Sequence, residues 1–290
     1  GSSVCSGMVS DVSNDDIVRL MVGRELQNRF NAMKENVSNL AHETVFEVRN
    51  VTSRDRKKVR DISFSVCRGE ILGFAGLVGS GRTELMNCLF GVDKRAGGEI
   101  RLNGKDISPR SPLDAVKKGM AYITESRRDN GFFPNFSIAQ NMAISRSLKD
   151  GGYKGAMGLF HEVDEQRTAE NQRELLALKC HSINQNITEL SGGNQQKVLI
   201  SKWLCCCPEV IIFDEPTRGI DVGAKAEIYK VMRQLADDGK VILMVSSELP
   251  EIITVCDRIA VFCEGRLTQI LTNRDDMSEE EIMAWALPQE

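Results

Sequence analysis

The chain has 290 residues, and its 41% hydrophobic and 27% charged residues are typical of a globular domain that buries a substantial core. Its formal net charge of −4 provides no general basic surface, so we expect no nucleic-acid partner. No apolar stretch approaches the ~20 residues needed to span a bilayer, and the chain opens without a signal-peptide pattern. We therefore expect any membrane association to come through a partner protein.

The nine cysteines do not form a recognisable framework. They are scattered, Cys205 to Cys207 are consecutive, and no pair has the Cys-x-x-Cys spacing of zinc ligands. We expect reduced thiols that pack as small apolar groups.

From Thr44 onward, short β-rich runs alternate with helical patterns, which is typical of an α/β fold with a mostly parallel sheet. The predicted strands span residues 45–51, 62–66, 71–75, 121–124, 210–213, 241–245 and 259–262. Helices are predicted over 82–90, over 162–178, and from the Ser191 region through 204. Residues 137–190 contain no convincing strand, and a glycine-rich stretch at 150–158 interrupts their helical patterns, so we predict an inserted helical subdomain over about 125–190.

The two ends of the chain resemble each other. Residues 265–267 are followed by the segment 276–282, residues 1–3 are followed by 11–17, and a single gap aligns the two copies. Ser278 and Ser13 take helix N-cap positions before acidic first turns, which suit the helix dipole. We predict that residues 1–43 are the tail of a preceding domain of the same kind plus a linker, and that 44–290 form one domain. The alternative is coincidence between two capped helices, with residues 1–3 left by cloning.

A glycine-rich loop follows the strand predicted at 71–75 and opens the helix predicted at 82–90. Glycines let backbone N–H groups turn toward phosphate oxygens, and the helix N-terminus adds its positive end. Thr83 is placed to ligand magnesium, while Arg82 replaces the usual lysine with a planar fork. A glycine turn without nucleotide is the alternative for this motif alone. The predicted nucleotide-binding residues are Gly76, Leu77, Val78, Gly79, Ser80, Gly81, Arg82, Thr83 and Glu84.

The apolar strand predicted at 210–213 ends in two carboxylates, Asp214 and Glu215. At such a strand end we expect Asp214 to hold magnesium, mostly through water, and Glu215 to polarise the attacking water as a general base. The pattern is weak alone and gains force from the motif that precedes it.

That motif, Leu190-Ser-Gly-Gly193, opens the helix predicted to run through Leu204. A serine, two glycines and a helix N-terminus form a second anion site. A simple N-cap with a glycine turn is the alternative for these residues alone. With the three motifs in this order, the chain resembles the ATP-binding cassette family, whose signature clamps the γ-phosphate held by the opposite subunit. The residues that the resemblance assigns to nucleotide are Ser191, Gly192, Gly193, Asn194 and Gln195, with Asp221 in the loop that communicates between subunits.

Three positions depart from the family pattern. Arg82 replaces lysine, Glu125 replaces a glutamine that senses magnesium and touches the permease, and Ser247 replaces a histidine that contacts the γ-phosphate. A serine donates one hydrogen bond but carries no charge. Residues 51–60 also lack the aromatic that often stacks on adenine in the family.

All three departures fall on the phosphate-loop side. Because family members work as head-to-tail pairs, we expect this loop to hold nucleotide that turns over slowly, while the intact signature completes the partner's site. The resemblance thus implies catalytic roles for Glu215 and Ser247, and metal contacts for Thr83, Glu125 and Asp214.

The segments Asn194-Gln-Gln and Thr217-Arg-Gly-Ile-Asp-Val-Gly-Ala-Lys look like the second cassette of bacterial monosaccharide importers, which fuse two cassettes in one chain. The resemblance implies an α/β P-loop cassette with a mixed, mainly parallel core sheet, an antiparallel β subdomain and an inserted α-helical subdomain. It also implies ATP and Mg²⁺, and sugar import driven from the cytoplasmic face of the inner membrane. The partners it implies are the first cassette, permease subunits contacted through about 125–141, and indirectly a periplasmic sugar-binding protein.

Two rivals remain at the level of sequence. One is a regulatory nucleotide-binding module that does not hydrolyse ATP, which Arg82 and Ser247 favour and Glu215 disfavours. The other is a cassette ATPase of DNA repair or translation, for which zinc-spaced cysteines or a long basic linker would be expected. The identity of the sugar does not follow from the residues.

Overall fold

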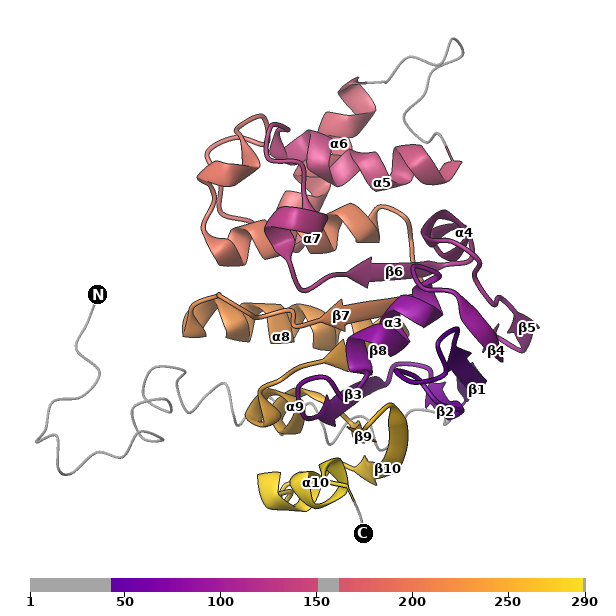
Figure 1. The fold of residues 1–290 in the computed structure, drawn as a ribbon. Coiled ribbons are helices and arrows are strands. Elements are labelled where there is room, and N and C mark those ends of the chain that lie inside the picture. The colour runs from indigo at the N-terminus through magenta and orange to yellow at the C-terminus, as the bar shows by residue number, and fades with distance from the viewer. Residues whose placement is uncertain (1–42, 151–161, 289–290) are drawn as a thin grey trace, which may run out of the picture.

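Two sheets organise the fold, which the computed structural model describes for residues 43–150 and 162–288 (Figure 1). The larger sheet has six strands in the order β10-β9-β3-β8-β7-β6, and only the β9–β10 pair is antiparallel. The smaller is an antiparallel sheet of four strands in the order β2-β1-β4-β5. The strands are β1 (Thr44–Ser53), β2 (Ile62–Cys67), β3 (Ile71–Gly76), β4 (Arg95–Leu102), β5 (Lys105–Asp106), β6 (Met120–Ile123), β7 (Val210–Asp214), β8 (Val241–Val245), β9 (Arg258–Cys263) and β10 (Arg266–Thr272).

Helices cover both faces of the larger sheet. Alternate residues of its strands point to opposite faces, so Leu72 and Phe74 enter a core shared with α3 and the small sheet, while Ile71 and Ala75 enter a core shared with α8, α9 and α10. The helices are α3 (Arg82–Phe90), α4 (Pro112–Lys117), α5 (Ile138–Asp150), α6 (Glu162–Leu175), α7 (Gly192–Leu204), α8 (Val222–Asp237), α9 (Leu249–Val255) and α10 (Glu279–Ala286). No helix in the described ranges has both the length and the apolar character needed to cross a membrane.

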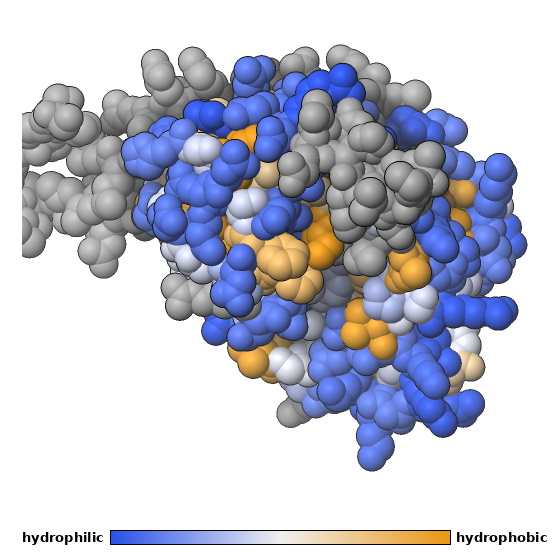
Figure 2. Space-filling view, turned by 90° about the horizontal axis from the view of Figure 1, so that it is seen from above, coloured by the Kyte–Doolittle hydropathy of each residue, from blue (hydrophilic) through white to orange (hydrophobic). Residues whose placement is uncertain are grey.

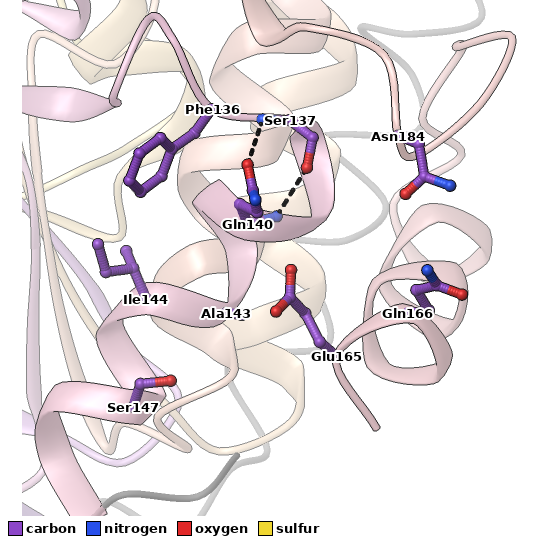
Figure 3. Close-up of a pocket in the computed structure, with 9 residues that line it drawn as sticks. All are labelled: Phe136, Ser137, Gln140, Ala143, Ile144, Ser147, Glu165, Gln166 and Asn184. Carbon is purple, nitrogen blue, oxygen red and sulfur yellow. Dashed lines mark hydrogen bonds between the residues drawn. The ribbon is translucent and has the colours of Figure 1, made fainter. Parts of the chain in front are cut away.

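A helical subdomain stands at one end of the sheet and is built from α5, α6 and the adjoining face of α7 (Figure 1). Its own core includes Ile138, Met142 and Leu199. α5 opens with a reciprocal cap, in which the Ser137 backbone N–H donates to Gln140 Oε1 (3.0 Å) and the Gln140 backbone N–H donates to Ser137 Oγ (3.2 Å) (Figure 3).

The predicted fold class is confirmed: a mixed α/β sheet with an antiparallel subdomain and a helical insertion. The strand predictions were correct to within one or two residues at their ends. The helix predicted over 162–178 was wrong at its end. α6 stops at Leu175, because Ala177 adopts a left-handed conformation (φ 46°) that no helix continues.

The predicted tandem repeat lies partly outside the described residues. At the C-terminal copy, Ser278 does cap α10, its Oγ accepting from the Glu281 backbone N–H at 3.2 Å before a first turn of three glutamates. Ser13 and the rest of residues 1–42 are outside the described part, as is most of the glycine-rich stretch at 150–158. The domain boundary at residue 44 therefore stays a prediction.

Candidate functional site

The glycine-rich loop runs from the last residue of β3 to the first of α3 and depends on its glycines. Gly76 and Gly81 have positive φ angles of 152° and 104°. A Cβ on Gly76 would lie 2.5 Å from the Phe262 carbonyl oxygen, and one on Gly81 would lie 2.2 Å from the Lys58 carbonyl oxygen. Any other residue would force the loop away from its supports, so glycine is required at both positions.

The middle of this loop, at Val78 and Gly79, is open to solvent, and Ser80 is held by a hydrogen bond from the turn between β9 and β10. Val78 is 93% exposed, and a Cβ on Gly79 would meet no atom within 4 Å. The Gly265 backbone N–H, in the turn between β9 and β10, donates to the Ser80 carbonyl at 2.8 Å. The Ser80 hydroxyl is buried and has no hydrogen-bond partner among the described residues. An open cradle at a helix N-terminus with an unsatisfied buried hydroxyl fits a phosphate group.

Arg82 is directed into the protein. It is 8% exposed, and its Nη1 donates to the Ser246 carbonyl oxygen, just after β8, at 2.6 Å. Burial lowers the pKa of Arg82, and the nearby carboxylates of Glu215 and Asp214 oppose that shift. One arm of the guanidinium is thus engaged by the protein's own backbone.

Asp214, at the end of β7, is 1% exposed, and both of its carboxylate oxygens accept hydrogen bonds. The Thr83 hydroxyl donates to Oδ1 (3.3 Å), and the Tyr122 hydroxyl donates to Oδ2 (2.9 Å). Burial raises the pKa of Asp214, and the bonds from Tyr122 and Thr83 oppose it. The two predicted metal contacts Thr83 and Asp214 therefore lie side by side as hard oxygen donors. They fit Mg²⁺, which takes few protein ligands and fills its shell with phosphate oxygens and water.

Glu215 and Ser247, to which the family resemblance assigns catalytic roles, are in contact with each other. The Ser247 hydroxyl donates to Glu215 Oε2 at 3.2 Å. Glu215 has a positive φ of 49° and its backbone N–H donates to the Val245 carbonyl, so the chain leaves β7 sharply and turns this side chain beside the end of β8. Burial raises the pKa of Glu215, and the Ser247 hydrogen bond opposes that shift.

The residues of the Leu-Ser-Gly-Gly motif open α7, with Ser191 at the N-cap. The Ser191 hydroxyl accepts from Asn194 Nδ2 at 2.9 Å, and Gln195 is buried with its Nε2 donating to the Leu190 carbonyl. A Cβ on Gly193 would lie 2.5 Å from the Cβ of Ala224, so this glycine lets α7 approach α8 closely. Asp221 caps α8, its Oδ1 accepting from the Ala224 backbone N–H.

The model of the family described as ABC transporter matches residues 59–218. This chain belongs to the ABC transporter family.

Curated relatives match this ABC cassette along nearly its whole length. It is 99% identical over 290 residues to the D-allose import ATP-binding protein AlsA of Escherichia coli (strain K12), covering 100% of this chain and 57% of that protein. It is 42% identical to a ribose import ATP-binding protein RbsA of Bacillus cereus, covering 99% and 56%. It is 43% identical to the galactose/methyl galactoside import ATP-binding protein MglA of Fusobacterium nucleatum subsp. nucleatum, covering 98% and 55%. The chain thus spans a little over half the length of these relatives.

Solved structures share the fold of this cassette. An ATP-binding cassette of an ABC transporter superposes with a TM-score of 0.71 at 21% identity, over 85% of this chain and 100% of that one. A nucleotide-free ATP-binding cassette from an ABC transporter gives 0.69 at 23% identity, over 84% and 95%.

Glu125 lies two residues after the end of β6, the strand next to β7. It is exposed and ion-paired with Arg218, in a groove of about 640 Å³ that Arg127 also lines. Arg127 donates from Nη1 to the Gly192 carbonyl (2.7 Å) and from Nη2 to the Gly219 carbonyl (3.1 Å). Arg218 connects Glu125 to the loop before Asp221, and Arg127, two residues further on, connects the same segment to the signature. The magnesium contact of Glu125 stays a prediction.

The structure adds residues that motif reading of the sequence missed. Tyr122 stands on β6, one strand away from Asp214, and no motif assigns it a role. Ser246 takes part through its backbone carbonyl, which any residue would supply. The only signal available for Tyr122 was a polar hydroxyl inside an otherwise apolar strand, since a buried tyrosine hydroxyl requires a partner.

Proposed function

We propose that this chain is the second ATP-binding cassette of a bacterial monosaccharide importer, with D-allose as the sugar, and that it couples ATP binding and hydrolysis to import. The observation that carries the proposal is the cluster of Thr83, Asp214, Glu215 and Ser247 beside an open phosphate loop. The sugar assignment rests on the 99% identity to a D-allose import ATP-binding protein.

Each residue of the cluster has a distinct task in this proposal. Backbone N–H groups of the loop bind the phosphates, while Thr83 and Asp214 hold magnesium, with Glu125 as a third contact once it leaves Arg218. Bound magnesium neutralises charge on the phosphates. Glu215 accepts a proton from the attacking water, and its raised pKa brings it closer to the pH at which a general base works well. Ser247 donates to Glu215 and so orients that carboxylate.

We further propose that the phosphate-loop face and the signature face of the cassette differ in how well they support ATP hydrolysis. The phosphate-loop face carries three changes. One N–H group of the Arg82 guanidinium donates to the Ser246 carbonyl and Glu125 is ion-paired with Arg218. The Ser247 side chain carries no charge. The other face keeps its signature, which would complete the ATP site of the first cassette. We therefore expect slow ATP turnover at this chain's own phosphate loop. Turnover should be rapid at the site that its signature forms with the first cassette.

The same Arg82 geometry favours a second candidate, a regulatory module that binds nucleotide without hydrolysing it. A guanidinium held by a backbone carbonyl positions only its remaining arm toward phosphate. The intact Glu215, with a hydrogen bond that orients it, argues for hydrolysis.

The partners in this proposal are the first cassette in the same full-length chain, joined through residues 1–43, and permease subunits. The periplasmic sugar-binding protein acts indirectly, and the cassette works at the cytoplasmic face of the inner membrane. Two aromatic side chains in the predicted contact region support a permease interface: Phe133 and Phe136 are 47% and 37% exposed, with ring centroids 5.1 Å apart. Phe136 also lines a pocket of about 560 Å³ along α5 and α6 (Figure 3), and hydrophobic patches interrupt the polar surface seen from above (Figure 2).

A comparison of ATP turnover tests the division of labour. We expect this chain alone to hydrolyse ATP at least about ten-fold more slowly than the full-length tandem protein, because two phosphate-contacting positions, Arg82 and Ser247, and the magnesium-sensing position, Glu125, are altered. Arg82→Lys combined with Ser247→His should raise the rate of the isolated chain. Brisk hydrolysis by the unmodified chain would contradict the degenerate site, and nucleotide binding with no hydrolysis in either protein would favour the regulatory module.

The sugar is tested separately by uptake. Cells lacking the gene for the full-length protein are given a panel of labelled monosaccharides, and the deletion should abolish uptake of D-allose while ribose and galactose uptake persist. Unchanged D-allose uptake would exclude that assignment without touching the ATPase proposal.

A further inference from the structure

Tyr122 makes a buried contact that the nucleotide motifs leave unexplained. Its hydroxyl donates to Asp214 Oδ2 at 2.9 Å, and the two residues are 4% and 1% exposed. In the parallel β6–β7 pair, Tyr122 is in register with Ile212, two residues before Asp214. Residues two apart on a strand share a face, so the tyrosine side chain reaches along β7 to the carboxylate at its end.

The ring of Tyr122 is fixed by packing at its other side. It meets Phe90, the last residue of α3, edge to face with centroids 5.4 Å apart, and Phe90 meets Trp203 of α7 at 5.9 Å. Edge-to-face aromatic pairs have a preferred geometry, so the hydroxyl is held at one place. Thr83 lies in the first turn of α3 and Phe90 is its last residue, so this one short helix carries one donor to Asp214 and packs against the other.

Each of the two donors contacts a different oxygen of the Asp214 carboxylate. Tyr122 occupies Oδ2, and Thr83 is next to Oδ1. A carboxylate whose far oxygen is held cannot rotate freely, so Oδ1 stays turned toward the threonine hydroxyl. Magnesium demands near-ideal octahedral geometry, which makes the orientation of a ligand oxygen more important than its mere presence.

We propose that Tyr122 is a positioning residue for magnesium: by holding Asp214 Oδ2, it presents Oδ1 beside Thr83 to the ion or its bound water. The inference rests on the proposed magnesium-nucleotide site at Thr83 and Asp214. It gives a tyrosine on β6, outside all three nucleotide motifs, a role in that site.

Tyr122→Phe is the test, because it removes the hydroxyl and keeps the ring that packs on Phe90. We would measure binding of a fluorescent ATP analogue to this chain while titrating Mg²⁺. The half-saturating Mg²⁺ concentration should rise about five-fold or more in the variant, while binding without Mg²⁺ stays unchanged. In the Asp214→Asn background, Tyr122→Phe should add no further change, since the carboxylate it orients is gone.

Tyr229→Phe is the matched control. Tyr229 is also buried, and its hydroxyl bonds the carboxylate of Glu251. This variant should lose a comparable amount of thermal stability and keep the wild-type Mg²⁺ titration.

The outcomes separate the inference from the function on which it rests. If the unmodified chain binds nucleotide with no dependence on Mg²⁺, the proposed magnesium site fails and the role of Tyr122 fails with it. If the unmodified chain depends on Mg²⁺ and Tyr122→Phe gives the same titration, only the role of Tyr122 is overturned. An equal loss of binding with and without Mg²⁺ would also overturn it, because that result indicates a general packing defect.

Discussion

Burial governs the chemistry of individual residues around the phosphate loop. Arg82 and Asp214 are both buried, and burial shifts their pKa values against the charged form, down for the arginine and up for the aspartate. Hydrogen bonds offset that cost: the Ser246 carbonyl accepts from Arg82, and Thr83 and Tyr122 donate to Asp214. The site therefore holds opposite charges within a shell of neutral partners, an arrangement suited to receiving a further charged group.

Glu215→Gln tests the catalytic role at this scale. Glutamine keeps the size of the side chain and can still accept from the Ser247 hydroxyl, but it cannot take a proton from water. Loss of a general base lowers a rate by about 10²- to 10⁴-fold, so ATP hydrolysis assigned to this loop should fall in that range while nucleotide binding persists. Steady-state hydrolysis and analogue binding, measured on the same preparation, check both halves.

Glu248→Gln is the control for that measurement, because Glu248 is an exposed carboxylate that pairs with Lys225 on the neighbouring helix. Its hydrolysis rate should match the unmodified chain. Hydrolysis unaffected by Glu215→Gln would remove Glu215 from the mechanism.

Sequence reasoning reached most of these residues because motifs encode side chains that must touch nucleotide. It named Thr83 and Asp214 as metal contacts and Glu215 and Ser247 as catalytic residues, and the contacts within each pair come from the structure. It could not reach Tyr122, whose partner comes from a neighbouring strand, or the Ser246 carbonyl, which carries no residue identity. Contacts fixed by strand order or by backbone leave little trace in a single sequence.

Some helices and strands could be predicted from the sequence, and others could not. β8 and α3 were predicted with their observed bounds, because an apolar strand buried on both faces and a helix opened by a glycine loop give strong local signals. β4 and β10 were not predicted. β4 contains Gly97 and Gly98, which weaken a strand pattern, and its residues are largely exposed in the first half. β10 lies at the sheet edge, and its side chains are mostly half-buried.

Lys202 supplies a pH test of how α7 is held against the helical subdomain. It is buried, its Nζ donates to the Gly131 carbonyl, and it lies 5.1 Å from the centroid of the Trp203 ring. Burial lowers the pKa of Lys202 to about 8, and Cys206 opposes that shift. Between that value and the ordinary lysine pKa of 10.5, the unfolded chain binds the proton more tightly than the folded chain does. Stability attributable to this group therefore rises as pH rises through that window.

This pH dependence predicts a measurable difference in stability between the unmodified chain and Lys202 variants. Relative to Lys202→Met, the unmodified chain should be less stable at pH 7 and should gain on the variant by about 3 kcal/mol as pH approaches 10.5. Lys202→Arg is the contrast, because arginine keeps its proton throughout the window and its penalty should not be relieved. Urea unfolding of the three proteins across this pH range provides the comparison. A stability difference between the unmodified chain and Lys202→Met that does not change with pH would mean that the ammonium is not penalised by burial.

At the scale of the whole molecule, the larger sheet is the frame that carries both faces of the cassette. The phosphate loop follows β3, Asp214 is the last residue of β7, and Ser246 follows β8. Because these parallel strands are neighbours in the order β3-β8-β7, their carboxyl ends bring the three parts together. The signature belongs to α7, whose residues enter the core of the helical subdomain as well as that of the sheet. The distance between the two faces is thus set by how helices dock on the sheet, which local sequence patterns do not specify.

A buried ion pair joins α8 to the starts of β9 and β3, and its loss should have a large effect on stability. Asp257 precedes β9, its Oδ1 accepts from Nη2 of Arg233 on α8 at 2.9 Å, and its Oδ2 accepts from the Ile71 backbone N–H at the start of β3 at 2.8 Å. Arg233 is buried, so Asp257→Ala would leave a guanidinium without its carboxylate inside the protein. Breaking such a pair costs about 3–5 kcal/mol.

Asp276→Ala is the matched control, because Asp276 pairs with Arg274 at 3.0 Å on the exposed surface. Exposed pairs contribute about 0–1 kcal/mol, since water solvates either charge once its partner is gone. Urea unfolding should therefore rank Asp257→Ala several kcal/mol below Asp276→Ala, with both below or equal to the unmodified chain. Equal stabilities for the two variants would mean that Arg233 finds another partner or reaches water, and that α8, β3 and β9 are held together by apolar packing rather than by this charge.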